Sequence, residues 1–186
     1  DVMSPFTVNL FRFAIALAVL GALHFRDASR RGVSWTESLR RAPLAVVGLG
    51  LLAHVAYQTA FILGIDRLTA GMGALLMATA PLWTSLLAHA ARIDRLSRAG
   101  WIGVGLGLLG ALLVILGRPR GAEIDGTWSG VALVLAGAFA WALFTVLARP
   151  VLLRGVSSLG LTFWGLLVAF PLLTALGAPG IVDVPW

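Results

Sequence analysis

The sequence contains no cysteine and no lysine, and charged residues of any kind are scarce. Charged side chains make up 12% of the 186 residues, about half of the share that covers the surface of a soluble domain. The absence of cysteine excludes disulfides, thiolate metal sites and cysteine nucleophiles. All fourteen basic residues are arginine, and because they form no basic patch interleaved with aromatic side chains, nucleic acid is not expected as a partner.

Apolar residues make up 59% of the chain, and they gather in long runs separated by short charged segments. An α-helix rises 1.5 Å per residue, so about 20 apolar residues cross the hydrocarbon layer of a membrane. The predicted fold class is therefore all-α, a polytopic membrane helical bundle, with the lipid bilayer as its solvent. Six segments qualify as spans: about 5–25, 42–65, 69–91, 99–117, 128–148 and 159–178.

Several residues at the edges of these segments carry signals for helix starts and stops. Ser4 precedes a proline at the first helical position, and Ser97, Thr127 and Ser158 are similar candidate N-caps. A glycine and a proline, at 177 and 179, are predicted to end the last span.

The distribution of arginine predicts the orientation of the spans. Connections after the first, third and fifth spans hold ten arginines, and the alternate connections hold three. Because arginine-rich loops stay on the cytoplasmic side, residues 1 and 186 are expected outside. The ten are Arg26, Arg30, Arg31, Arg40, Arg41, Arg92, Arg95, Arg98, Arg149 and Arg154, and the three are Arg67, Arg118 and Arg120.

Two segments of the chain are weakly alike. Residues 4–11 (SPFTVNLF) and 157–164 (SSLGLTFW) both open a span with small polar residues followed by aromatics. The first of these spans is predicted to run inward and the sixth outward. Equivalent helices of opposite direction, five spans apart, indicate an inverted repeat of five helices, for which ten helices are expected in total.

The sequence resembles the EamA-type drug/metabolite transporter superfamily along nearly its whole length. The motifs that carry the resemblance are 4–7 (SPFT) with 12–13 (RF), 68–76 (LTAGMGALL) with 80–82 (APL), 94–97 (DRLS), 103–110 (GVGLGLLG) and 141–145 (WALFT). The resemblance implies ten helices in two inverted repeats. Residues 1–117 would be the first repeat without its first helix, and 128–186 the start of the second, with three helices to follow.

The same resemblance implies a function. Members move metabolites such as amino acids, or drugs, usually outward, by alternating access, so a small-molecule substrate is expected and a cofactor is not. The expected location is the inner membrane of a bacterial cell, as a multi-pass protein.

Arg12 is the only charged residue inside a predicted span. It lies about seven residues, or roughly 10 Å, from the outer end of its helix. A lipid-facing arginine at the midplane costs roughly 2.5 kcal/mol or more, so intramembrane arginines usually face the bundle interior or a watery cavity. Two interpretations follow: Arg12 binds an anionic group such as a substrate carboxylate, or it is structural and either bonds helix-end carbonyls or extends to the outer headgroups.

The second span carries a polar stripe. His54, Tyr57, Gln58 and Phe61 share one face if the helix is regular. Tyr57 and Gln58 lie near the midplane, where unpaired polar groups are costly, so they are predicted to line a substrate cavity or to bond another helix. His54 is in addition a candidate proton carrier. Trp141, in the fifth span, is a candidate wall of an apolar cavity, with packing against helices or lipid as the alternative.

Two further motifs predict helix geometry. Pro81 lies inside the third span, where it produces either a discontinuous helix of the kind found at transporter sites or a packing kink. Gly103 and Gly107 permit close approach of another helix, and a homodimer seam is one candidate location for that contact.

Alternatives to a carrier remain at this stage. No predicted span holds a carboxylate that could relay protons or bind sodium, so coupling would use a histidine or helices outside this sequence; otherwise the protein is a facilitator or an exchanger. An intramembrane enzyme, such as a protease or a lipid transferase, needs a nucleophile–base pair. Ser85 and His89 lie one helical turn apart but lack an orienting acid. A non-transporting structural subunit is the third alternative.

Overall fold

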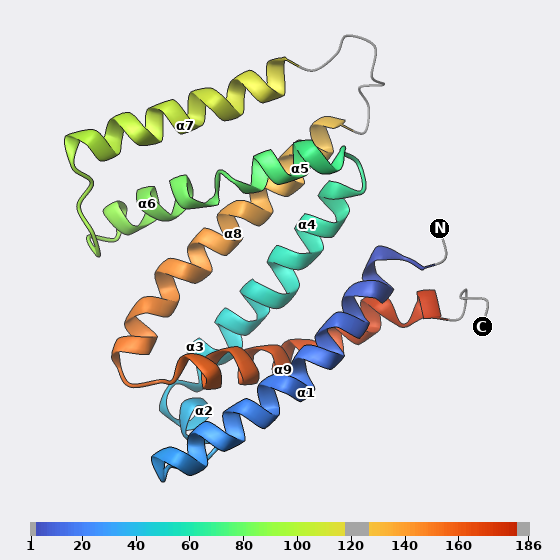
Figure 1. The fold of residues 1–186 in the computed structure, drawn as a ribbon, viewed down its shortest axis with the longest axis vertical. Helices are drawn as coiled ribbons and strands as arrows, with labels where there is room; N and C mark the ends of the chain where they lie inside the picture. The colour runs from blue at the N-terminus through green and yellow to red at the C-terminus, as the bar shows by residue number, and fades with distance from the viewer. Residues whose placement is uncertain (1–2, 118–126, 182–186) are drawn as a thin grey trace. The chain divides into compact units, whose positions relative to one another are not determined.

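A computed structural model describes residues 3–117 and 127–181, and within these ranges all regular structure is helical (Figure 1). In chain order the elements are α1 (Pro5–Arg31), α2 (Glu37–Arg41), α3 (Pro43–Gly50), the π-helix η1 (Leu51–Ala56), α4 (Tyr57–Ile65), α5 (Ala70–Met77), α6 (Ala80–Ala90), α7 (Arg98–Leu116), α8 (Thr127–Leu153), α9 (Ser158–Gly177) and the 3-10 helix η2 (Pro179–Ile181).

The helices match the predicted spans in number and position. Among the described residues, five helical stretches are long and apolar enough to cross a membrane: Pro5–Arg31, Pro43–Ile65, Ala70–Ala90, Trp128–Leu153 and Ser158–Gly177. The remaining predicted span is present as α7, of which Arg98–Leu113 is a shorter apolar helix. The prediction of an all-α polytopic membrane bundle is therefore confirmed.

The N-caps follow the sequence signals with one correction. Ser4 and Ser97 each accept a backbone N–H from the first turn of their helix, as predicted. The cap of α9 is Ser157 and not Ser158, because Ser157 has the extended backbone that a cap needs and its side chain accepts the N–H of Gly160 at 2.9 Å. The side chain of Thr127 lies outside the described residues. The last span ends at residue 177, as predicted.

Helix α1 is longer than predicted. It continues past residue 25 to Arg31 and ends where Gly32 takes a left-handed φ of 63°. No residue between 25 and 31 breaks a helix, and Asp27 pairs with Arg31 one turn away at 3.2 Å. Arg26 and Arg30, assigned to a loop above, therefore lie on the last turns of a helix. Of the thirteen arginines used for the orientation, those at 118 and 120 lie outside the described residues.

The second span contains a π-helix that the sequence did not predict. Its turns are wider than those of α3 and α4 on either side, so side chains after it are rotated relative to those before it. The predicted single face from His54 to Phe61 assumed a regular α-helix. That spacing applies only within α4, where the rings of Tyr57 and Phe61 stack with centroids 6.0 Å apart.

The third span is discontinuous. Helix α5 ends at Met77 and α6 begins at Ala80, with Pro81 in its first turn. The break is held by Thr79, which is buried: its hydroxyl donates to the Leu76 carbonyl at 2.7 Å and accepts the indole N–H of Trp83 at 3.2 Å. The polar side chain at the break is thus satisfied by its own helices.

Contacts divide the chain into two compact units, Asp1–Val55 with Leu147–Trp186, and Ala56–Val146. In the first unit, α1 and α9 lie side by side and antiparallel (Figure 1), because Thr7 at the start of α1 donates its hydroxyl to the carbonyl of Gly177 at the end of α9 at 2.9 Å. The core of this unit consists of Phe13, Leu166, Ala169 and Leu173.

Glycine brings α3 against α9 in the same unit. A β-carbon added to Gly50 would lie 2.5 Å from the carbonyl oxygen of Gly165, so the two backbones touch. No side chain larger than hydrogen fits between them.

In the second unit, α5 packs on α8 through a core of Leu76, Val131 and Val134. Gly107 of α7 faces Leu82 of α6, whereas a β-carbon on Gly103 would meet no atom within 4 Å. One of the two predicted packing glycines is therefore used inside this unit. The boundaries of the two units differ from those of the expected repeats. The units are defined by which residues are in contact, whereas the repeats are defined by which helices are equivalent. The repeats 1–117 and 128–186 remain a prediction.

Candidate functional site

Arg12 lies on α1 beside a buried amide. Its guanidinium donates from Nη2 to Oδ1 of Asn9 at 2.7 Å, and its Cζ lies 4.9 Å from the centre of the Phe13 ring. Asn9 and Phe13 are buried, and Arg12 is exposed within the described structure. The sequence analysis missed Asn9, although its position three residues before Arg12 places the two side chains on neighbouring turns of one face.

His54 joins the same group through Phe13. Its ring meets the Phe13 ring edge to face, with centroids 5.6 Å apart. The structure therefore brings two of the predicted site residues, Arg12 and His54, against one aromatic ring in the first unit.

Tyr57 and Trp141 form a second group, in the other unit. Their ring centroids are 5.2 Å apart, and the Trp141 ring also contacts Phe144 at 5.4 Å. Gly137, one turn before Trp141, also faces this group: a β-carbon there would lie 3.5 Å from the Tyr57 carbonyl oxygen, which is an ordinary contact distance. Trp141, predicted to wall a cavity, is thus in contact with Tyr57 of the predicted polar stripe.

Gln58 is half-buried on α4. Within the described part of the chain its amide makes no hydrogen bond. An amide has two donors and an acceptor with two lone pairs, so Gln58 has bonding capacity that these residues do not use.

A polar junction at the other end of α1 was also missed. The Trp35 carbonyl accepts two hydrogen bonds, from Nε2 of His24 at 2.7 Å and from Nε1 of Trp164 at 3.2 Å. Because a carbonyl only accepts, His24 Nε2 carries a proton. Indole and imidazole rings also stack here: Trp35 on Trp164 at 5.1 Å and His24 on Phe163 at 5.2 Å.

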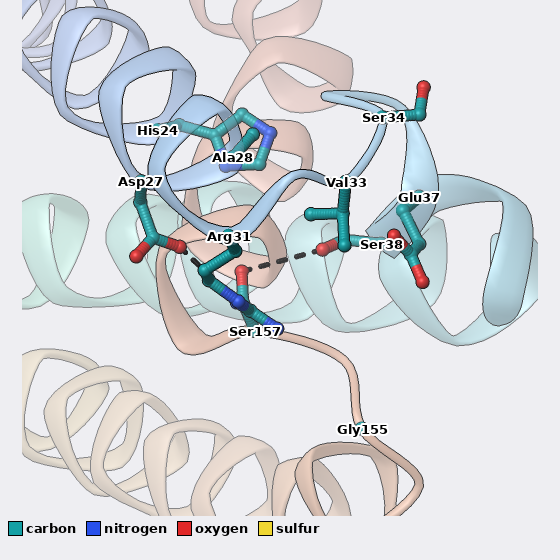
Figure 2. Close-up of a pocket in the computed structure, with 10 residues that line it drawn as sticks. All are labelled: His24, Asp27, Ala28, Arg31, Val33, Ser34, Glu37, Ser38, Gly155 and Ser157. Carbon is teal, nitrogen blue, oxygen red and sulfur yellow. Dashed lines mark hydrogen bonds and ion pairs between the residues drawn. The ribbon is translucent and has the colours of Figure 1, made fainter.

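Figure 2 shows the small cavity next to this junction, lined by His24, Asp27, Arg31 and Ser38 among others. The cavity measures about 10 Å³, room for about one water molecule. Nδ1 of His24 is buried and has no partner among the described residues. The cavity is too small for a metabolite, so we assign the junction a structural role.

The structure does not pair the residues of the enzyme alternative. Ser85 donates its hydroxyl to the Pro81 carbonyl at 2.9 Å, and Nδ1 of His89 accepts the N–H of Leu96 at 3.1 Å. Neither bond forms a nucleophile–base pair. Among the described residues there is also no group of three or more His, Cys, Asp or Glu side chains that could hold a metal ion.

The long apolar helices define an integral membrane protein. Polar side chains lie within them: Asn9 and Arg12 on α1 and Gln58 on α4. Residues 1–116 match the EamA-like transporter family. The chain belongs to this family, and the resemblance noted from its motifs is confirmed.

Curated relatives support the same assignment. The chain is 28% identical over 148 residues to the uncharacterized transporter YyaM of Bacillus subtilis (78% of this chain, 47% of the relative). It is 32% identical over 149 residues to the uncharacterized protein PA1977 of Pseudomonas aeruginosa (80% and 46%), and 28% identical over 123 residues to the uncharacterized transporter YdfC of B. subtilis (65% and 39%). The chain thus spans about half the length of these relatives. No solved structure matches it.

Proposed function

We propose that the full-length protein is a carrier that exports a small metabolite or drug by alternating access. Membership of a transporter family supports the class of function. The observation that carries the proposal is an arginine on a membrane-spanning helix, bonded to a buried amide and exposed in the described structure.

Arg12 is proposed to bind an anionic group of the substrate, such as a carboxylate. The bond to Asn9 at 2.7 Å fixes one edge of the guanidinium, and a guanidinium has five N–H donors in a planar fork. The donors that Asn9 leaves free match the two oxygens of a carboxylate, and bidentate pairs of this kind are strong and directional. A transported amino acid would present such a group.

Tyr57, Gln58 and Trp141 are proposed as further substrate contacts and are testable on their own. The Tyr57–Trp141 pair offers an apolar aromatic surface, and Gln58 offers an amide that has no partner among the described residues. Ligand sites typically combine apolar walls with a few polar groups that fix orientation. His54, beside Phe13, is retained as a candidate proton carrier.

The proposed architecture is ten helices in two inverted five-helix repeats, in the inner membrane of a bacterium. The antiparallel packing of α1 against α9 supports it, since these two helices are the proposed equivalents of opposite direction. A homodimer is part of the proposal only if a second copy covers α7 near Gly103, where a β-carbon would meet no atom within 4 Å.

Export assays in bacteria that express the full-length gene test the substrate role of Arg12. Cells would be screened for export of amino acids and for resistance to toxic analogues. With a substrate in hand, we expect Arg12→Ala to weaken apparent affinity by about tenfold or more, since a hydrogen bond to a charged group contributes about 1.5–3 kcal/mol. Arg12→Lys keeps the charge and is expected to retain part of the affinity.

Val8→Ala is the matched control, because Val8 lies one turn away on the same helix and is exposed. It should leave transport unchanged. An Arg12→Ala protein that reaches the membrane in normal amount and transports like the wild type would remove Arg12 from the site.

A further inference from the structure

Two arginines near the end of α1 have no carboxylate partner in the part of the chain that the structure describes. Arg31 pairs with Asp27 at 3.2 Å and Arg41 pairs with Glu37, but Arg26 and Arg30 form no salt bridge within the described residues. They lie four residues apart and so face the same way, where like charges repel each other. An external anion between them would relieve this repulsion.

The two arginines line a surface groove of about 300 Å³ whose other walls are Leu23, Asp27 and Leu159. The carboxylate of Asp27 is already paired with Arg31, so the groove has a surplus of positive charge. Its remaining walls are leucines, one from α1 and one from the first turn of α9. The groove is therefore amphipathic: cationic on one side and apolar on the other.

The apolar side of the groove continues along α1 as an exposed stripe. Leu23, Val19 and Ile15 follow at intervals of four residues and are 47%, 54% and 67% exposed. The intervals of three and four residues from Ile15 to Arg30 keep all these side chains on one face of the helix. One face of α1 thus carries a row of exposed apolar side chains followed by two arginines that form no salt bridge among the described residues.

The length of α1 determines how deep its apolar stripe and its two arginines lie in the membrane. Its 27 residues measure about 40 Å at 1.5 Å per residue, against a hydrocarbon layer of about 30 Å. Counted from Pro5, about 20 residues cross the hydrocarbon, so Leu23 lies within it and Arg26 and Arg30 lie among the headgroups.

We propose that this face of α1 is a binding site for an anionic phospholipid. The phosphate sits between Arg26 and Arg30, and one acyl chain runs along Leu23, Val19 and Ile15. A soluble anion would use the arginines alone, whereas a phospholipid uses the arginines and the leucine walls together. Because the site is independent of Arg12 and of transport, it stands or falls separately from the proposed function.

Purified full-length protein tests the proposal by native mass spectrometry and by thermal unfolding in nanodiscs of phosphatidylglycerol or of zwitterionic phosphatidylcholine. The wild type should retain phosphatidylglycerol in preference to phosphatidylcholine. Arg26→Gln with Arg30→Gln should weaken that retention by roughly 30-fold, since each arginine near the surface contributes about one factor of five. Arg95→Gln with Arg98→Gln removes the same charge from another segment and should leave retention unchanged.

Leu23→Asn tests the apolar half of the site with both arginines in place. Reduced retention of phosphatidylglycerol is expected. Three results would overturn the proposal: equal lipid retention by the wild type and the Arg26/Arg30 double variant, equal loss in the Arg95/Arg98 control, or stabilisation by soluble glycerol phosphate as large as that by the lipid.

Discussion

The backbone contact between α3 and α9 allows a sharp test of the fold. Replacing Gly50 by alanine would place a methyl group 2.5 Å from the Gly165 carbonyl oxygen and 2.8 Å from its carbonyl carbon. Ordinary contact begins at 3.4 Å, and the Cα of Gly165 lies closer still than its carbonyl oxygen, so the helices would have to separate by about 1 Å. The obstructing atoms are backbone, which cannot move aside by changing a rotamer.

Overpacking of this kind costs about 1–3 kcal/mol or more, against a gain of about 1 kcal/mol from the higher helix propensity of alanine. We therefore expect Gly50→Ala to lower the free energy of unfolding by up to about 2 kcal/mol. Gly48, two residues earlier on α3, is the matched control, because a β-carbon there meets no atom within 4 Å. Gly48→Ala should be neutral or stabilising by up to about 1 kcal/mol.

The two variants would be made in the full-length protein and compared by denaturant titration and thermal unfolding in detergent micelles, with tryptophan fluorescence as the signal. The difference between them, about 1–3 kcal/mol, is the measured quantity. If Gly50→Ala proved as stable as Gly48→Ala, α3 and α9 would not touch at this position, and the packing described for the first unit would be wrong.

Two further stability predictions use the same measurements. Arg92, which follows the C-cap residue Ala91 of α6, has a left-handed φ of 57°, and this costs about 1–2 kcal/mol for a residue with a β-carbon. Arg92→Gly should therefore raise the unfolding midpoint, while Arg95→Gly, where φ is not positive, should not; equal effects would contradict the assigned strain. Thr7→Val removes the 2.9 Å bond to Gly177 and should destabilise by about 1 kcal/mol, while Thr7→Ser keeps the hydroxyl and should cost less; indistinguishable variants would show that the bond contributes nothing.

Much of the fold could be predicted because lipid imposes a simple rule on composition. Apolar run length located the spans, and Ser4 and Ser97 marked two starts because a serine before a helix satisfies free N–H groups. The predicted end of α1, at residue 25, was wrong because the charged residues after it were taken as a loop. The helix in fact continues until Gly32. The π-helix was missed because the spacing argument assumed a regular α-helix, and π-helical turns are rare insertions within such helices.

The candidate site was less accessible to sequence reasoning. Arg12 stood out as a charge in an apolar run, and Asn9 could have been found from its spacing. The stripe from His54 to Phe61 depended on helix phase, which the π-helix alters. The junction at Trp35 could not be predicted, because its acceptor is a backbone carbonyl and its donors come from residues 11 and 129 positions away.

Helices α1 and α9 are fastened near both ends: by Thr7 and Gly177 at one, and by His24, Trp35 and Trp164 at the other. Contacts near both ends of two packed helices restrict both sliding and rotation of one helix against the other. A rearrangement that tilts α1 or α9 is therefore expected to move both helices together as one rigid body. Residues 5 and 177 are far apart in the sequence, yet the helices that contain them are expected to move as one rigid body.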